Sequence, residues 1–327
     1  MIVVIGGSGR VGRQVAAQLR QQNLPVRAIS RGLNAAGAPP GAEVARADLA
    51  DPASLEPHLA GAQAVFLVWP FTSPELTAGL APKVAEIAAR HTGRIVYLSA
   101  QAAADRPGSF WALAERAIED SGASWTFLRP TGFAANTLMW ADQIRSGDVV
   151  RWPFGAAARA LIDERDIAAV AVRALTGDGH DGARYLLSGP AVLTQAEQLA
   201  AIGRAVGREL HWEELPRQAA LEALTAAWGD PAFAEMALDA WHWFVDNPET
   251  VTSAVQDLTG VPARSFADWA AANAAAFRCA CLPGRAARAG SWSGPRRRFC
   301  CLPGTTGRLP GRRLLITVAS RYWPAPT

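Results

Sequence analysis

A glycine pattern at the start of the chain constrains the fold more than any other feature of the sequence. A short apolar run at residues 2–5 leads into Gly6, Gly9 and Gly12, which are spaced G-x-x-G-x-x-G and followed directly by an amphipathic segment. Glycines at this spacing allow a tight turn, close approach of the backbone to a pyrophosphate, and close helix-to-strand packing. Because a helix N-terminus carries unpaired N–H groups and the positive end of a dipole, it favours an anion. The pattern predicts a βαβ unit that binds a dinucleotide.

The first 130 residues alternate short β-branched runs with longer amphipathic stretches. Apolar side chains recur at helical spacing, as at Val11, Val15 and Leu19, and we assign these stripes to packing on the sheet. The alternation predicts an α/β fold, with a Rossmann-type doubly wound parallel sheet forming a dinucleotide-binding core over residues 1–130. Six strands are expected, at residues 2–5, 26–29, 43–45, 64–68, 94–98 and 125–128.

Residues 131–277 have a looser pattern and predict a smaller, mainly helical C-terminal substrate lobe, with strands and helices partly returning to the core. Thr194 and Glu197 have the spacing of a capping box, and Ser265 is an expected helix cap. The expected helices are at residues 134–146, 164–176, 194–206, 217–228, 231–245 and 266–277, with strands at 149–150 and 184–187.

Residues 278–327 differ from the rest in composition. This segment holds ten of the 32 basic residues, all four cysteines and none of the 29 acidic residues. We expect this Arg/Cys/Pro/Gly-rich tail to be disordered or to be an artefact of the reading frame. Its Cys-x-Cys and its adjacent cysteine pair lack the usual spacing of zinc ligands, so we predict no metal site.

The other 277 residues carry 22 basic and 29 acidic groups, and this acidic balance argues against nucleic-acid binding by bulk electrostatics. After Met1 the chain has neither a basic segment nor an apolar stretch long enough for a signal peptide or a membrane span. We therefore expect a cytoplasmic protein with no nucleic-acid and no membrane partner.

The end of the second expected strand bears on the choice of dinucleotide. An acidic residue there would bond the ribose 2′-hydroxyl of NAD, whereas an arginine would pair with the 2′-phosphate of NADP. The strand ends in Ser30-Arg31, without a carboxylate. A planar bidentate cation beside a small hydroxyl suits a phosphate, so we predict NADP(H) rather than NAD(H) as the cofactor.

Several further motifs follow the glycine loop in a fixed order: Ala47-Asp48-Leu49, Val96-Tyr97-Leu98-Ser99, Trp125-Thr126-Phe127-Leu128-Arg129-Pro130, Arg165-Asp166-Ile167-Ala168 and Leu187-Ser188-Gly189-Pro190. With them, the chain up to about residue 277 resembles the atypical short-chain dehydrogenase/reductases and, within them, the NmrA-like group of NAD(P)-binding proteins. That family includes reductases, epimerase-like enzymes and proteins that only sense the dinucleotide.

The resemblance implies a role for residues at several strand ends. Ser8, Gly9, Arg10 and Val11 would hold the pyrophosphate, Arg31 the 2′-phosphate, and Asp48 and Leu49 the adenine. Val68, Trp69, Ser99 and Pro130 would surround the nicotinamide. All of them lie at the carboxyl edge of the expected sheet, where open α/β sheets bind ligands.

One departure from the larger superfamily leaves the catalytic residues unknown. Its reductases use Tyr-x-x-x-Lys on the helix after the fifth strand as a proton relay. Here Trp111 and Glu115 stand at those positions, and Lys83, the only lysine, belongs to another expected helix. We expect Glu115 to be a carboxylate on the helix surface paired with Arg116 or Arg129, the alternative being an acid in an apolar site.

Two functions remain open from the sequence. The first is an NADPH-dependent oxidoreductase of a small apolar carbonyl, enone or quinone, held in part by one or two of the tryptophans in the lobe. The second is a non-catalytic NADP(H)-sensing regulatory protein with a protein partner, which the missing relay favours. Turnover of NADPH would separate them.

Overall fold

The computed structural model describes residues 1–32 and 39–278. In this part of the chain, seven strands pair in one sheet in the order β3-β2-β1-β4-β5-β6-β9, and every neighbouring pair is parallel. The sequence order reverses between β1 and β4, as in doubly wound sheets. The strands are β1 (Ile2–Ile5), β2 (Val26–Ile29), β3 (Glu43–Ala45), β4 (Ala64–Val68), β5 (Arg94–Leu98), β6 (Ser124–Pro130) and β9 (Ala183–Leu187).

The expected fold class is confirmed, but the expected number of strands was one too low. The strand expected at residues 184–187 was counted with the lobe, some of whose strands and helices were expected to return to the core. As β9 it is the seventh strand of the sheet and pairs with β6 in register from Thr126 opposite Ala183 to Pro130 opposite Leu187. A helix, α7 (Glu164–Thr176), precedes β9 and packs on α1 (Arg10–Gln21), so the chain returns to the sheet from the lobe. The sequence analysis expected a partial return to the core, but the pairing of this strand with β6 was not predicted.

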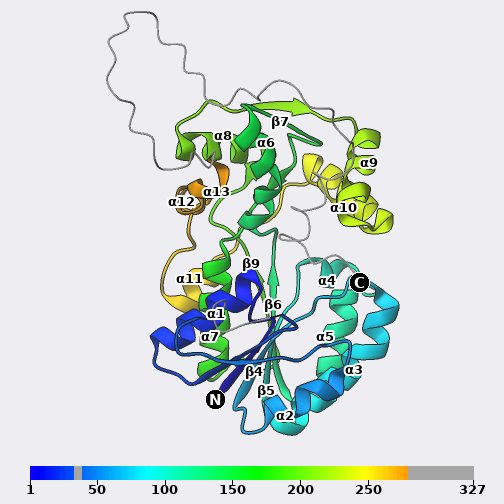
Figure 1. Ribbon diagram of the computed structural model, residues 1–327, viewed down its shortest axis with the longest axis vertical. Coiled ribbons are helices and arrows are strands. Elements are labelled where there is room, and N and C mark those ends of the chain that lie inside the picture. Colours follow the sequence, from blue (N-terminus) through cyan, green and yellow to red (C-terminus); the bar gives the residue numbers. More distant parts are fainter. Residues whose placement is uncertain (33–38, 279–327) are drawn as a thin grey trace, which may run out of the picture.

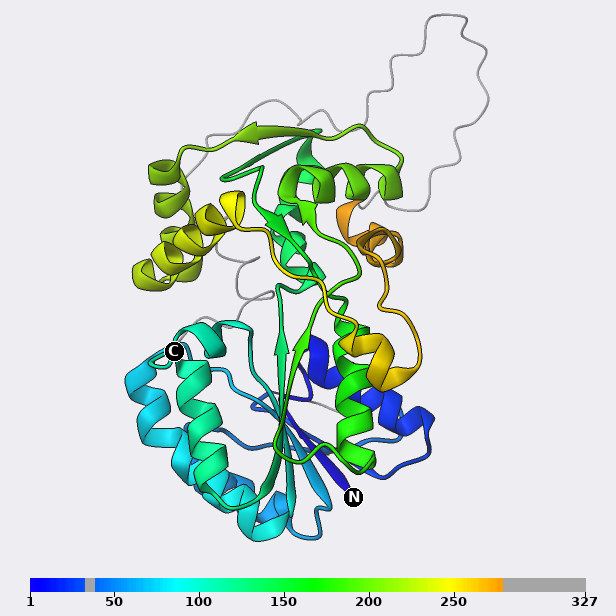
Figure 2. The same cartoon turned by 180° about the vertical axis from the view of Figure 1, so that it is seen from behind.

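Helices cover both faces of the sheet, as Figures 1 and 2 show. The first helix pair, α1 and α7, packs on one face with α11 (Ala254–Thr259), and its core includes Val4, Val15 and Ile167. The other face carries η2 (Pro52–Leu55), α2 (Glu56–Leu59), α3 (Pro74–His91), α4 (Ala102–Asp105) and α5 (Phe110–Asp120). Burial on both faces explains why the central strands are almost wholly apolar.

The remaining elements form a lobe above the edge at which the strands of the sheet end (Figure 1). Its core centres on Trp140, Ile202 and Trp269, and two short strand pairs, β7 with β11 and β8 with β10, run through it. The elements are η3 (Ala134–Trp140), α6 (Ala141–Ser146), β7 (Val149–Trp152), β8 (Ala158–Arg159), β10 (Leu193–Thr194), α8 (Gln195–Val206), β11 (His211–Glu214), α9 (Arg217–Trp228), α10 (Pro231–Asp246), α12 (Phe266–Ala272) and α13 (Ala274–Phe277).

The expected helix caps are confirmed, and one expected helix is divided. Thr194 and Glu197 form both bonds of a capping box, and Ser265 caps α12. The helix expected over residues 134–146 is a 3₁₀ helix up to Trp140 and an α-helix only from Ala141. The predicted tail lies, except for Arg278, outside the described residues. Within the described ranges, no helix is both long and apolar enough to cross a membrane.

Candidate functional site

The glycine loop joins β1 to α1 by a turn that other residues would disturb. Gly6 has φ +88°, a left-handed conformation that favours glycine, and a Cβ there would lie 2.8 Å from Cβ of Val68. At Gly12, a Cβ would lie 2.3 Å from the carbonyl oxygen of Gly6. The expected tight turn and close helix packing are therefore present, and Val68 at the end of β4 packs directly under the turn.

The N-terminus of α1 has the features of an anion site. Gly9 is its N-cap residue, no side chain caps the helix, and its first turn contains no acidic residue. The first N–H groups of a helix have no partner within the helix, so a helix N-terminus of this kind can bind an anion. Ser8 and Gly9 are exposed and Arg10 is half-buried, whereas the side chain of Val11 packs in the core and leaves only its backbone for binding.

Arg31 follows β2 and is exposed beside a cavity of about 250 Å³. Asp48 lines the same cavity, and its Oδ1 accepts the N–H of Ala50 at 3.0 Å. The side chain of Leu49 is buried in the core, and Leu49 is not one of the residues that line this cavity. The structure thus brings together Arg31 and Asp48, which the sequence placed at the adenosine, and it adds Arg46 and Ser54, which the sequence analysis missed.

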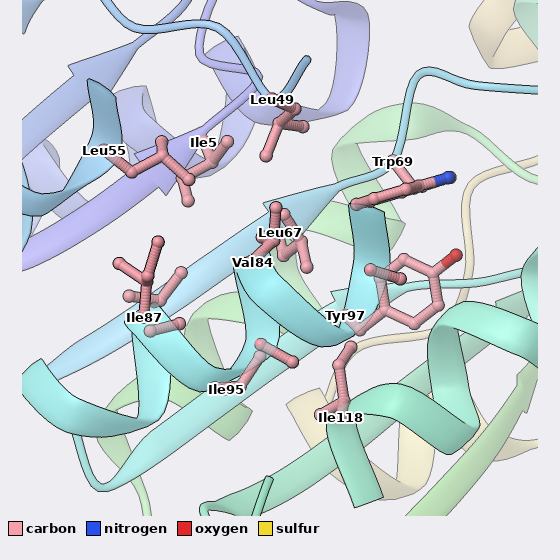
Figure 3. Close-up of a cluster of buried hydrophobic side chains, with 14 of the residues drawn as sticks. Ile5, Leu49, Leu55, Leu67, Trp69, Val84, Ile87, Ile95, Tyr97 and Ile118 are labelled. Carbon is pink, nitrogen blue, oxygen red and sulfur yellow. The ribbon is translucent and has the colours of Figure 1, made fainter. Parts of the chain in front are cut away.

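At the end of β4, the side chain of Trp69 belongs to the core. It is 8% exposed, its indole N–H donates to the hydroxyl of Thr77 on α3 at 2.9 Å, and its ring meets Phe71 edge to face. Figure 3 shows Trp69 above the same cluster as Val84 of α3 and Tyr97 of β5. Trp69 can therefore shape the neighbouring strand end, with its indole fixed on the α3 side of the sheet.

A buried polar network closes the ends of β5 and β6. The Ser99 hydroxyl donates to Oε1 of Glu115 at 2.6 Å, and Arg129 donates to both oxygens of the same carboxylate, at 2.9 and 2.5 Å. Pairing of Glu115 with Arg129 was expected, but the expected surface position was wrong, because Glu115 is 4% exposed. Glu115 shares the inner face of α5 with Ala114 and Ile118. Its position on this apolar face of the helix was the feature of the sequence that could have indicated its burial.

This network leaves no relay of the Tyr-x-x-x-Lys kind. The proton of Ser99 is committed to Glu115, and Glu115 is held by a bidentate cation. The hydrogen bonds from Arg129 to Glu115 raise the pKa of the guanidinium above its usual value. Ser99 can therefore offer only an oxygen lone pair to a bound ligand.

Tyr97 of β5 lies close enough to this network for the charge of Glu115 to act on it, and it is fully buried in the core. Its hydroxyl has no hydrogen-bond partner among the described residues. Burial, and then the charge of Glu115, raises the pKa of this phenol well above its ordinary value. Such a phenol is a poor proton donor at neutral pH.

Pro130 ends β6 within the sheet. Its carbonyl accepts the N–H of Gln101 at 3.0 Å, and this hydrogen bond joins the ends of β5 and β6.

In the lobe, Trp140 and Trp269 are each 1% exposed and pack in its core, while Trp243 is 62% exposed. Across the two described ranges, His, Cys, Asp and Glu side chains form no group of three that could hold a metal ion.

Comparison with known proteins identifies the family to which this chain belongs. The family model described as NAD(P)H-binding matches residues 6–178. A (4-alkanoyl-5-oxo-2,5-dihydrofuran-3-yl)methyl phosphate reductase of Streptomyces griseus is 41% identical over 285 residues, 85% of this chain and 99% of that protein. An NAD(P)H azoreductase of Xenophilus azovorans is 34% identical, over 86% of this chain and all of its own length.

A solved structure shows the same fold with a cofactor. The NADPH-dependent quinone oxidoreductase of Escherichia coli, in complex with NADPH, aligns with a TM-score of 0.68 and 25% identity, over 83% of this chain and 99% of that one. The matched stretch of the family model begins at Gly6 and so includes the glycine loop described above. The chain is a member of the NAD(P)H-binding oxidoreductases, in their NmrA-like, atypical short-chain dehydrogenase/reductase branch.

Proposed function

We propose that this protein is an NADPH-dependent reductase of a small apolar carbonyl, enone or quinone. The observation that carries the proposal is the open edge of the sheet, where the glycine loop before α1 donates the N–H groups of Gly6 and Gly7 to the carbonyl of Ile29, two residues before Arg31. Its relatives named as reductases support the direction of the chemistry. Bound NADPH supplies a hydride, and the residues of this chain bind and orient it.

The residues present fit that cofactor in three places. The glycine loop would let the pyrophosphate approach the backbone, and the N-terminus of α1 would hold it with the positive end of the helix dipole. Arg31 supplies a cation at the position of the 2′-phosphate, with no acidic residue at the end of β2 to bond a 2′-hydroxyl instead. The ends of β4, β5 and β6 form the rest of the edge, on which Ser99 offers an acceptor.

The substrate class follows from what the chain lacks as well as from its relatives. The lobe above the edge has tryptophans that are only partly buried, such as Trp152 and Trp212, and these suit a flat apolar ligand. The relatives are named for an alkanoyl dihydrofuranone that carries a methyl phosphate, for azo compounds and for quinones. Quinones and enones accept a hydride to give a phenolate or an enolate, which water can protonate. Such substrates need no strong protein acid, in keeping with the closed network around Glu115.

Steady-state consumption of NADPH tests the reductase directly. We expect turnover with at least one of a naphthoquinone, an azo dye and an acyl butenolide, with one NADPH oxidised for each two-electron reduction. Stoichiometric NADPH binding without consumption across this panel would contradict a reductase and favour the sensing alternative, to which the absence of a relay already points.

The preference for NADPH has its own test. A charge-assisted contact to phosphate contributes on the order of 1.5–3 kcal/mol, and because Arg31 is exposed we expect the lower end, about a tenfold preference over NADH. Arg31→Ala should remove most of this preference and leave NADH binding unchanged. Arg204→Ala, an exposed arginine of α8 in the lobe, is the matched control. Equal affinity of the unmutated protein for both dinucleotides would refute the preference.

A further inference from the structure

The arginines at the two ends of the strand pair β2–β3 differ in whether they form an ion pair. Near the amino end, Arg27 pairs with Glu43 across the strands, with Nε 2.8 Å from Oε1. At the carboxyl end, the N–H of Ser30 donates to the carbonyl of Ala45 at 3.3 Å, so the two chain segments remain paired one residue beyond the end of β2. Arg46, the residue after β3, therefore lies beside Ser30 and Arg31. Two arginines therefore lie close together at one edge.

Neither of these arginines has a carboxylate to neutralise it. Arg31 and Arg46 are both exposed and line the cavity of about 250 Å³, and neither is within 4.0 Å of a carboxylate in the described chain. Like charges at neighbouring strand positions repel each other. Two such cations, neither of them in an ion pair within the described chain, are favourable neighbours when an anion lies between them.

The other described walls of the cavity agree with this interpretation. Among the lining residues, Arg31 and Arg46 are cations and Asp48 is the single carboxylate, so the described wall carries a net positive charge. Next to Arg31, the hydroxyl of Ser30 is buried and has no partner among the described residues. The volume is below the about 300–1,000 Å³ of pockets for whole ligands, and it suits one fragment, such as a ribose phosphate.

We infer that Arg46 is a second determinant of dinucleotide specificity, and that it binds the 2′-phosphate of NADPH together with Arg31. This inference rests on the proposed function and adds to it a residue outside the motifs of the sequence analysis. A phosphate monoester carries about 1.5 to 2 negative charges at pH 7, so a single guanidinium leaves it partly uncompensated. Arg31 reaches it from β2 and Arg46 from β3, which gives a clamp built on two adjacent strands.

Two probes that differ only in the 2′-phosphate test this clamp, namely adenosine 2′,5′-bisphosphate and adenosine 5′-monophosphate, measured by calorimetry on the full chain. We expect Arg46→Ala to weaken binding of the bisphosphate about tenfold and that of the monophosphate less than twofold. Arg46→Lys should fall between Arg46→Ala and the unmutated protein, because lysine keeps the charge and loses the planar fork. The double variant of Arg31 and Arg46 should bind both probes alike.

Controls separate this inference from the proposed function. Arg204→Ala should leave both affinities unchanged, and the preference of the unmutated protein for the bisphosphate should decline below about pH 6, where the phosphate dianion takes up a proton and loses one negative charge. If Arg31→Ala has its full effect while Arg46→Ala behaves like Arg204→Ala, the role of Arg46 is refuted and the NADPH preference stands. If Arg46→Ala weakens both probes equally, it does not bind the 2′-phosphate. If the unmutated protein does not distinguish the probes, the preference itself is wrong.

Discussion

The two ends of the carboxyl edge of the sheet differ in how far their polar groups are paired within the protein. At the end formed by β1, β2 and β3, a helix N-terminus has no side-chain cap, and two arginines near it lack a carboxylate partner in the described chain. At the end formed by β5 and β6, Ser99, Glu115 and Arg129 satisfy one another below the surface.

This difference indicates that the first end binds a ligand and that the second end supports the fold. Two exposed guanidinium groups that form no ion pair in the described chain, beside an open helix N-terminus, can bind an anion by charge-assisted hydrogen bonds, so the first end is suited to receive one. A satisfied buried network is costly to break and has little capacity to exchange protons, so the second end holds its strands and the Ser99 oxygen in place. The same edge therefore separates a ligand-binding part from a structural one.

The largest effect is expected at the first end, from Gly9→Val. A Cβ on Gly9 meets only the carbonyl oxygen of Gly6, at 3.1 Å, so the variant should still fold. Because valine is a poorer N-cap residue than glycine, the free energy of unfolding should fall by about 1 kcal/mol. The branched side chain would occupy the approach of the pyrophosphate, and NADPH affinity should fall more than a hundredfold in a fluorescence titration.

Gly93→Val is the matched control for this variant, because Gly93 precedes β5 at the opposite edge and nothing lies within 4 Å of a Cβ there. It should leave NADPH binding unchanged. Retention of affinity by Gly9→Val would show that the glycine loop is not the pyrophosphate site.

At the second end, removal of the Glu115 carboxylate should act on stability. Glu115→Ala leaves the guanidinium of Arg129, whose side chain is 18% exposed, without its partner. Loss of one member of a buried pair costs about 3–5 kcal/mol, and we expect about 3 kcal/mol in urea unfolding because Arg129 retains some solvent contact. A change below about 1 kcal/mol would mean that the network contributes little to the fold.

A smaller effect is expected on catalysis at the same residue. Glu115→Gln keeps the shape and removes the charge, so turnover of a reducible quinone, corrected for folded protein, should change less than about tenfold. Loss of a general acid or base typically costs 10² to 10⁴. A hundredfold loss with unchanged NADPH affinity would instead identify Glu115 as an acid–base residue.

The smallest effect is expected from Tyr97→Phe. This change removes a buried hydroxyl that has no partner in the described chain and adds no atom to the core. We expect thermal unfolding to show a gain of up to about 1 kcal/mol and turnover to stay within twofold. A large loss of turnover would show that the phenol reaches the reaction despite its raised pKa.

Local pattern was sufficient for much of this molecule. The glycine spacing predicted the loop geometry at Gly6 and Gly12, and the alternation of apolar runs predicted six strands and the fold class, because strand period and turn chemistry act over a few residues. The capping residues Thr194 and Ser265 were likewise readable, since a cap is complete within four positions. The likeness of the motifs to NAD(P)-binding proteins agreed with the family shown by comparison.

Contacts between residues distant in sequence were decided only by the tertiary structure. The pairing of β9 with β6 joins positions more than fifty residues apart, and Arg46 meets Arg31 only because β3 lies beside β2. Glu115 was assigned to the surface because a charged residue in an amphipathic helix usually lies there, whereas Arg129 and Ser99 on neighbouring strands make its burial favourable. The sequence determined which elements form, because each depends on near neighbours, and the packing of strands decided which charges meet.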